Sequence, residues 1–146
     1  MNINEVIPKE EVQRACKELG IRDWTKLTET KVQVNEARTI QAAVGSEALQ
    51  IPIEWFQQGL EIELEHGLQF HDANVTNNHP ILTGKIVLAH LKEMLDYYIR
   101  LEVAELEGDL LKASRKGDTE KLSQIYKKLI KARAALSEWE NSEQGA

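Results

Sequence analysis

The sequence contains little cysteine, proline or aromatic residue: its 146 residues include one Cys, three Pro and only 5% Phe, Trp and Tyr. With a single thiol, Cys16, the chain can form no internal disulfide and no zinc site built on several cysteines. Cys16 falls on the apolar stripe of a predicted helix over residues 8–19. We therefore expect a buried and unreactive thiol.

Long apolar runs and an excess of positive charge are also missing. No run approaches the roughly 20 apolar residues of a membrane-spanning helix, and the first residues lack the basic and apolar parts of a signal peptide. A cytoplasmic protein is therefore expected. The formal net charge of −6 argues against a nucleic acid or an anionic membrane as partner, because both require a basic surface.

The sequence is 42% hydrophobic and 29% charged, and most of its apolar residues recur at helical spacings. No stretch of alternating β-branched residues predicts a strand, so we predict an all-α fold, a small helical bundle in a single domain over residues 1–146. Asn35, Pro52, Thr83 and Asp118 are predicted to begin helices, and Gly67 to end one. The predicted helices cover residues 8–19, 35–45, 52–66, 84–116 and 118–140, and a long loop covers 68–82.

Two apolar seams at alternating three- and four-residue spacings predict that the chain ends in an antiparallel helical hairpin. The turn at Gly117 and Asp118 is too short for any other arrangement of the two helices. The first seam consists of Met94, Tyr97, Leu101, Ala104, Gly108 and Leu111. The second consists of Leu122, Ile125, Leu129, Ala132, Leu136 and Trp139.

Two Glu–His pairs are the candidates for chemistry. Glu63 and His66 lie three residues apart on one predicted helix, and His90 and Glu93 lie three apart on the next. Glu-x-x-His is the spacing by which helical bundles offer a carboxylate and an imidazole to one metal ion. We therefore predict a site for iron, manganese or zinc at these four residues. Glu61 and Glu65 point away from the apolar face of their helix and are expected to be solvated.

Three further residues are weaker candidates for the same site. His71 and His79 lie in the predicted loop and could add ligands, although loop histidines are commonly just exposed. Tyr97 follows His90 and Glu93 on one stripe of the long predicted helix and could donate a hydrogen bond to a ligand. Thr83-Gly84-Lys85 resembles the end of a phosphate-binding loop, but the upstream glycine and a preceding strand are absent.

Several segments together resemble a family of small bacterial and phage proteins that is catalogued as a domain of unknown function. The likeness covers about residues 32–102, so it implies that residues 1–31 are an N-terminal helical extension and that the helix over 118–140 is an addition. The family usually has an acidic residue where this chain has Asn78 or His79. The segments are Glu61-Ile-Glu-Leu-Glu-His-Gly67, Asn74-Val-Thr76, Thr83-Gly-Lys-Ile86, Ala89-His-Leu91 and Asp96-Tyr-Tyr98.

Three functions are consistent with the sequence. The first is metal binding by the two Glu–His pairs. The second is a non-catalytic accessory role, in which the Glu/His cluster is a structural hydrogen-bond network and the terminal hairpin recruits a protein partner or forms a homodimer. The third is an enzyme that uses His66 or His90 with a carboxylate as general acid–base, but no nucleophile or substrate-binding motif supports catalysis.

Overall fold

A computed structural model describes residues 7–45 and 47–142, which contain six α-helices and no β-strand. The predicted all-α class is thus confirmed for this part of the chain. None of its helices is long and apolar enough to cross a membrane. The chain divides into two compact units, Met1–Glu93 and Met94–Ala146, and each is described by itself.

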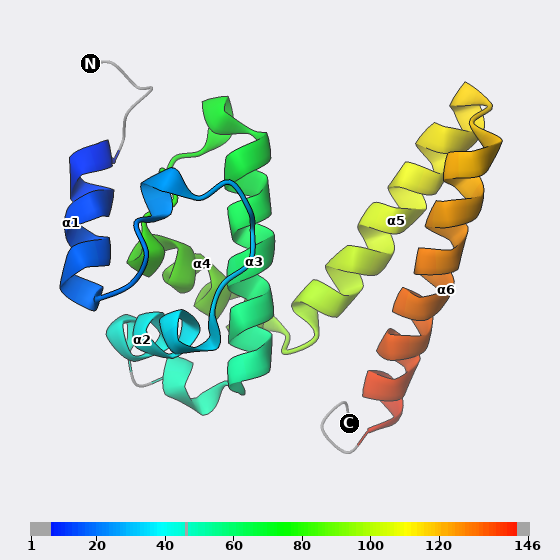
Figure 1. Ribbon diagram of the computed structural model, residues 1–146. Helices are drawn as coiled ribbons and strands as arrows, with labels where there is room; N and C mark the ends of the chain where they lie inside the picture. The colour runs from blue at the N-terminus through cyan, green and yellow to red at the C-terminus, as the bar shows by residue number, and fades with distance from the viewer. Residues whose placement is uncertain (1–6, 46, 143–146) are drawn as a thin grey trace. The chain divides into compact units, whose positions relative to one another are not determined.

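In the first unit, α1 (Lys9–Leu19) packs on α4 (Pro80–Glu93), and α2 (Val34–Val44) packs on both α4 and α3 (Ile53–Gln69), which also pack on one another (Figure 1). The one-turn helix η1 (Trp24–Lys26) follows α1 and contacts it. The core consists of fully buried apolar side chains from every one of these elements. Among the largest are Val12, Trp24, Ile40, Phe56, Leu60 and Val87. Cys16 is buried as predicted, and burial raises the pKa of its thiol.

A buried ion pair links the segment after α1 to the beginning of α2. Glu36 is almost fully buried and accepts hydrogen bonds from the backbone N–H and the Nε of Arg22, at 3.1 and 2.8 Å. Burial raises the pKa of Glu36, but these bonds and the N–H of Gln33 lower it more, and the net pKa is lowered. Gln33 and Glu36 form a capping box, so α2 begins at Val34 and the predicted cap at Asn35 is wrong.

Glycine at position 84 allows α4 to approach α2 and α3 closely. A Cβ atom at Gly84 would lie 2.7 Å from Val44 Cγ2 and 2.8 Å from Ile40 Cγ2. Both contacts are far shorter than van der Waals contact, so only glycine fits at this helix crossing. Thr83 precedes it inside the first turn of α4, which begins at Pro80, so the predicted cap at Thr83 is wrong. The Thr83 hydroxyl instead donates to the carbonyl of His79 at 2.9 Å.

The end of α3 also differs from the prediction, because the helix passes through Gly67 and ends at Gln69. Gly67 is required there as a point of close approach. A Cβ atom on it would overlap Asn78 Oδ1 and lie 2.9 Å from Asn74 Nδ2. The Asn74 amide donates to the carbonyl of Gly67 at 3.2 Å and to Asn78 Oδ1 at 2.8 Å. The missing side chain therefore lets the connection between α3 and α4 fold onto α3.

The second unit is the predicted antiparallel hairpin, in which α5 (Tyr97–Lys116) and α6 (Thr119–Asn141) lie side by side (Figure 1). Gly117 ends α5 with a left-handed φ of 68°, and Asp118 caps α6 by accepting from the N–H of Lys121 at 3.0 Å. The α6 seam is confirmed, since Ile125, Leu129 and Ala132 are buried. Self-association through this hairpin stays a prediction.

Two expectations for the preceding helix are wrong. The helix predicted over 84–116 is interrupted between Glu93 and Tyr97, and buried Asp96 stands before α5, 2.7 Å from Arg100 Nη2. The predicted seam of α5 is also wrong, because its residues Ala104, Gly108 and Leu111 are exposed. Another stripe of α5 is covered instead: Ala113 is buried, and Ile99, Val103, Leu106 and Leu110 are half-buried. The latter stripe has the larger apolar side chains, so packing it removes more apolar area from water.

Replacing Gly84 by alanine should destabilise the protein by about 1–3 kcal/mol, because the new methyl group overpacks the junction of α2, α3 and α4. The matched control is Gly108→Ala, since nothing lies within 4 Å of a Cβ there. That control should stabilise α5 by up to about 1 kcal/mol through helix propensity. Urea unfolding followed by circular dichroism measures both. Equal effects of the two substitutions would contradict the close approach at Gly84.

Gly67→Ala should cost about 1–3 kcal/mol by the same measurement, because Asn78 is buried and cannot move away freely. Asn78 has a φ of 59°, a conformation that glycine adopts without strain. Asn78→Gly in the Gly67→Ala background should therefore restore part of the lost stability by removing the overlapping amide. Additive losses in the double variant would show that the two residues are not in contact.

Candidate functional site

Three of the four predicted metal ligands come together in the first unit. Glu63 on α3 lies between two imidazoles: its Oε2 is 3.9 Å from His66 Nδ1 on the same helix, and its Oε1 is 3.6 Å from His90 Nε2 on α4. The helical spacing of three residues brings His66 over Glu63, and the packing of α3 on α4 brings His90 to it. The result is one carboxylate with an imidazole on each side.

The fourth predicted ligand, Glu93, takes no part in these contacts. It is the last residue of α4 and is exposed. The predicted stripe of His90, Glu93 and Tyr97 is not continuous, because the helix ends at Glu93 and Tyr97 begins α5. Tyr97 belongs to the second unit, where its ring meets that of Tyr98 edge-on at 5.1 Å. The hydrogen bond that Tyr97 was predicted to donate to a ligand stays a prediction.

The loop histidines are placed apart from Glu63. His71 is exposed in a one-turn helix, η3 (His71–Ala73). His79 is buried directly before α4, where its Nδ1 accepts from the N–H of Leu82 at 3.5 Å and its Nε2 lies 3.8 Å from Glu11 Oε1 on α1. His79 thus closes the N-terminus of α4 and links it to α1. Among the residues that the structure describes, no group of three or more His, Cys, Asp or Glu is placed to hold a metal ion.

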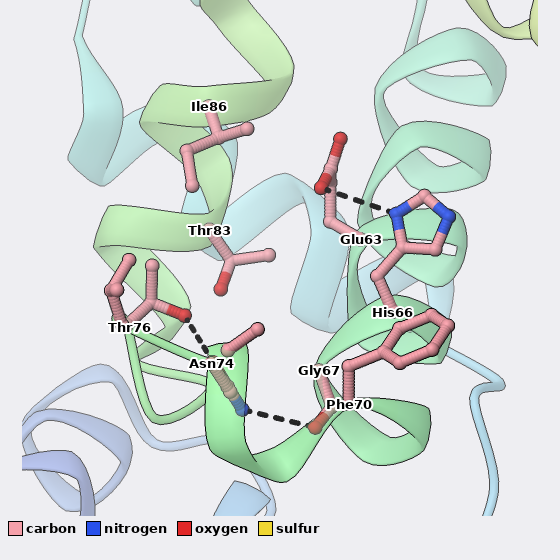
Figure 2. Close-up of a pocket in the computed structure, with 10 residues that line it drawn as sticks. Glu63, His66, Gly67, Phe70, Asn74, Thr76, Thr83 and Ile86 are labelled. Atoms are coloured by element: carbon pink, nitrogen blue, oxygen red, sulfur yellow. Dashed lines mark hydrogen bonds and ion pairs between the residues drawn. The ribbon is translucent and has the colours of Figure 1, made fainter. Parts of the chain in front are cut away.

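A pocket of about 200 Å³ opens beside Glu63 and His66. Figure 2 shows these two side chains facing Thr83 and Ile86 of α4 across it, with Asn74 and Phe70 at the connection between the helices. The side chain of Glu63 is 16% exposed and that of His66 is 40% exposed. The pocket thus combines a half-buried carboxylate with an imidazole and polar hydroxyl and amide groups.

Apolar residues form another part of the same pocket. Phe70 and Val75 line it and are unusually exposed for large hydrophobic residues, at 48% and 64%. Both lie in the connection between α3 and α4, which was expected to be a polar loop. Hydrophobic side chains exposed beside a concave polar site are typical of ligand-binding surfaces. In the sequence, the only sign of this apolar surface is that Phe70 and Val75 stand among residues that favour turns.

The connection is held rigidly around Asn74, a residue that sequence reasoning treated only as a turn former. Besides its bonds to Gly67 and Asn78, Asn74 accepts from the hydroxyl of Thr76 at 3.1 Å, and that hydroxyl accepts from the N–H of Asn78 at 3.2 Å. Asn77 and Asn78 adopt left-handed φ values of 49° and 59°, which asparagine tolerates better than most residues. These bonds fix the wall of the pocket opposite Glu63.

Another residue missed by the sequence analysis is Glu61, which was expected to be solvated. Its Oε1 accepts from the backbone N–H of Val32 at 3.1 Å, and its Oε2 lies 3.4 Å from Lys31 Nζ. Gln57, one turn earlier on α3, donates to the carbonyl of Val32 at 2.7 Å. These two residues attach the segment before α2 to α3. Glu65 is exposed, as predicted.

Comparison with known proteins identifies the family but no characterised relative. No curated protein and no solved structure matches the chain. One family model, for proteins of unknown function (DUF5661), matches residues 12–107. The match includes all of α2, α3 and α4 with the pocket between them, begins within α1 and ends within α5. Because it covers most of the chain, the protein belongs to the DUF5661 family of proteins of unknown function.

Proposed function

We propose that this protein binds a small organic cation with an apolar part in the pocket beside Glu63. The position of Glu63 supports the proposal: a half-buried carboxylate lies between two imidazoles, next to a pocket with exposed Phe70 and Val75. An ammonium group would pair with the carboxylate, and the apolar part of the ligand would contact the two hydrophobic side chains.

The chemistry of the pocket favours a cation over an anion. Glu63 is the one Asp or Glu among the residues that line it, and none of these residues is Lys or Arg. A charge-assisted hydrogen bond to a partly buried carboxylate is stronger than the same bond in open water. The neighbouring imidazoles can donate to the carboxylate and orient it. Phe70 offers an aromatic ring, which adds attraction for a cation or for another ring.

The size of the pocket limits the ligand. A volume of about 200 Å³ is below the roughly 300–1,000 Å³ of pockets that hold drug-sized molecules. A single ring with a short amine-bearing chain is the size that the space accommodates. Benzylamine is therefore a suitable probe, and benzyl alcohol provides the uncharged comparison of the same shape.

Benzylamine should bind with a millimolar Kd, and benzyl alcohol about tenfold more weakly, as measured by chemical shifts of labelled protein at pH 7. Tenfold corresponds to about 1.4 kcal/mol, close to the lower end of the roughly 1.5–3 kcal/mol that a hydrogen bond to a charged group contributes. Glu63→Gln should remove the preference for the amine. Glu65→Gln is the control, because Glu65 is exposed on the same helix and does not line the pocket.

Two results would contradict this function. One is equal binding of the amine and the alcohol by the unchanged protein. The other is an equal effect of Glu63→Gln and Glu65→Gln, because a general loss of negative charge would then explain the result. Circular dichroism of both variants checks that the helices are retained.

A second candidate is a metal ion held by Glu63, His66 and His90. The observation in its favour is that a carboxylate and two imidazoles from two helices lie together, a donor set suited to iron, manganese or zinc. Their present distances and the absence of a metal-holding group among the described residues mean that the side chains would have to draw together on binding. Water or a pocket ligand would complete the coordination.

Metal analysis of untagged protein distinguishes the two candidates. If a metal is bound, purified protein should contain close to one equivalent, and adding the same ion after chelation should raise the Tm. His90→Ala should abolish both effects, whereas Glu93→Gln should change neither, because Glu93 is exposed at the end of α4 and takes no part in the contacts of Glu63 with His66 and His90. Protein without stoichiometric metal and with an unchanged Tm would rule this candidate out.

A further inference from the structure

The hairpin of the second unit buries few side chains between its own helices. The buried residues of α5 and α6 are Tyr98, Ala113, Ile125, Leu129 and Ala132, and two of these are alanines. Helices in proteins are stabilised mainly by the apolar side chains that they bury against other elements. Two helices with so small a shared core therefore gain stability when another surface covers them.

The exposed large hydrophobic residues of the two helices gather on one face of the hairpin. They are Leu111 on α5 and Tyr126 and Ile130 on α6, each about half exposed. An ion pair between Glu107 and Arg133, at 2.8 Å, bridges the two helices and marks this face. Leu111 follows Glu107 by one turn of α5. Ile130 precedes Arg133 by one turn of α6, and Tyr126 lies one turn before Ile130. Residues one turn apart share a side of a helix, so all three hydrophobic side chains lie on the bridged face.

The opposite face of the hairpin is charged. A groove there is lined by Glu102 on α5 and by Lys128 and Lys131 on α6. Glu102 precedes Glu107 by five residues, and Lys128 precedes Arg133 by five, which turns each of them by about 140° around its helix. The hairpin is therefore amphipathic. One face suits water, and the other exposes apolar side chains of the kind found where proteins associate.

A second ion pair crosses the bridged face, in the opposite sense to the first. In the first pair the acid, Glu107, lies on α5 and the base, Arg133, lies on α6. In the second pair the base, Arg100, lies on α5 and the acid, Glu140, lies on α6, at 3.0 Å. Arg100 lies two turns before Glu107 on α5, so both pairs lie along the same face.

This order of charges makes the bridged face complementary to a second copy of itself. A two-fold rotation about an axis parallel to the helices places α5 of one copy over α6 of the other, at the same height. Glu107 then meets Arg133 of the second copy, and Arg100 meets Glu140 of the second copy. Acid faces base at each position, so the charges favour another copy of this chain as the occupant of the face.

From these observations we propose that two copies of this chain associate through the bridged face, so that their hairpins form a four-helix bundle. Neighbouring helices then run in opposite directions, as in up-and-down bundles. Leu111, Tyr126 and Ile130 are removed from water, and the alternating charges fix the register. This inference does not rest on the function proposed for the pocket beside Glu63, because that pocket belongs to the first unit.

Sedimentation velocity of the full chain over a wide range of concentrations tests the association. The mass should approach twice the 16.6 kDa of one chain as the concentration rises. A monomer at every concentration would overturn the proposal, and the face would then be bare or covered by another part of the same chain. Growth beyond a dimer would also overturn it, because a two-fold interface is closed.

One pair of substitutions tests which face is used. Ile130→Lys should raise the Kd of the dimer about tenfold or more, because each substitution enters a two-fold interface twice. Ala135→Lys is the matched control, since it adds the same charge at an exposed position on the opposite face of α6. Both positions are exposed in the single chain, so both variants should keep the helical circular dichroism. Equal values of Kd for the two variants would overturn the proposal.

Charge reversals distinguish pairing between copies from pairing within one hairpin. Glu107→Lys and Arg133→Glu should each weaken the dimer, because like charges then meet. An equimolar mixture of the two variants should recover it, since the introduced lysine of one copy meets the introduced glutamate of the other. The ion pair within each hairpin stays broken in that mixture. A mixture no more associated than its components would overturn the proposed register.

Glu63→Gln should leave the dimer unchanged, and Ile130→Lys should leave amine binding beside Glu63 unchanged. Failure of amine binding with intact association, or the reverse, therefore separates this proposal from the proposed function.

Discussion

The contact between Gly67 and the amides of Asn74 and Asn78 is the constraint on which the candidate site depends. A helix surface normally keeps other chain segments at the distance of its side chains, but a glycine lets backbone and amides meet directly. Here it lets the connection fold back onto α3. Because the connection, residues 70–79, is held by its own hydrogen bonds, α4 then packs along α3 and brings His90 to Glu63.

Local patterns predicted much of the fold. The end of α1 at Leu19, the turn at Gly117 and the cap at Asp118 follow from residue preferences that act within a few positions of the chain. The Glu63–His66 pair follows from helical spacing, and its meeting with His90 follows once two helices are known to pack. The α6 seam was predictable because α6 has only one strongly apolar face.

The errors arise where a residue's role is set by a distant part of the chain. In the sequence Gly67 resembles a glycine that ends a helix, yet it lies inside α3 because Asn74 and Asn78 occupy the space of its missing side chain. α5 has two apolar stripes, and spacing alone cannot show which one packs on α6. His79 resembles a metal ligand by residue type, but it caps α4; an acidic residue, as in the family resemblance, could accept from the same N–H.

The connection between α3 and α4 thus forms a wall of the pocket beside Glu63. There a half-buried carboxylate with exposed Phe70 and Val75 suits a cation. Asn74 lines this pocket, and its amide donates to Gly67 and Asn78. Because these bonds close the connection onto α3, a substitution that breaks them should weaken binding in the pocket even though it leaves Glu63 unchanged.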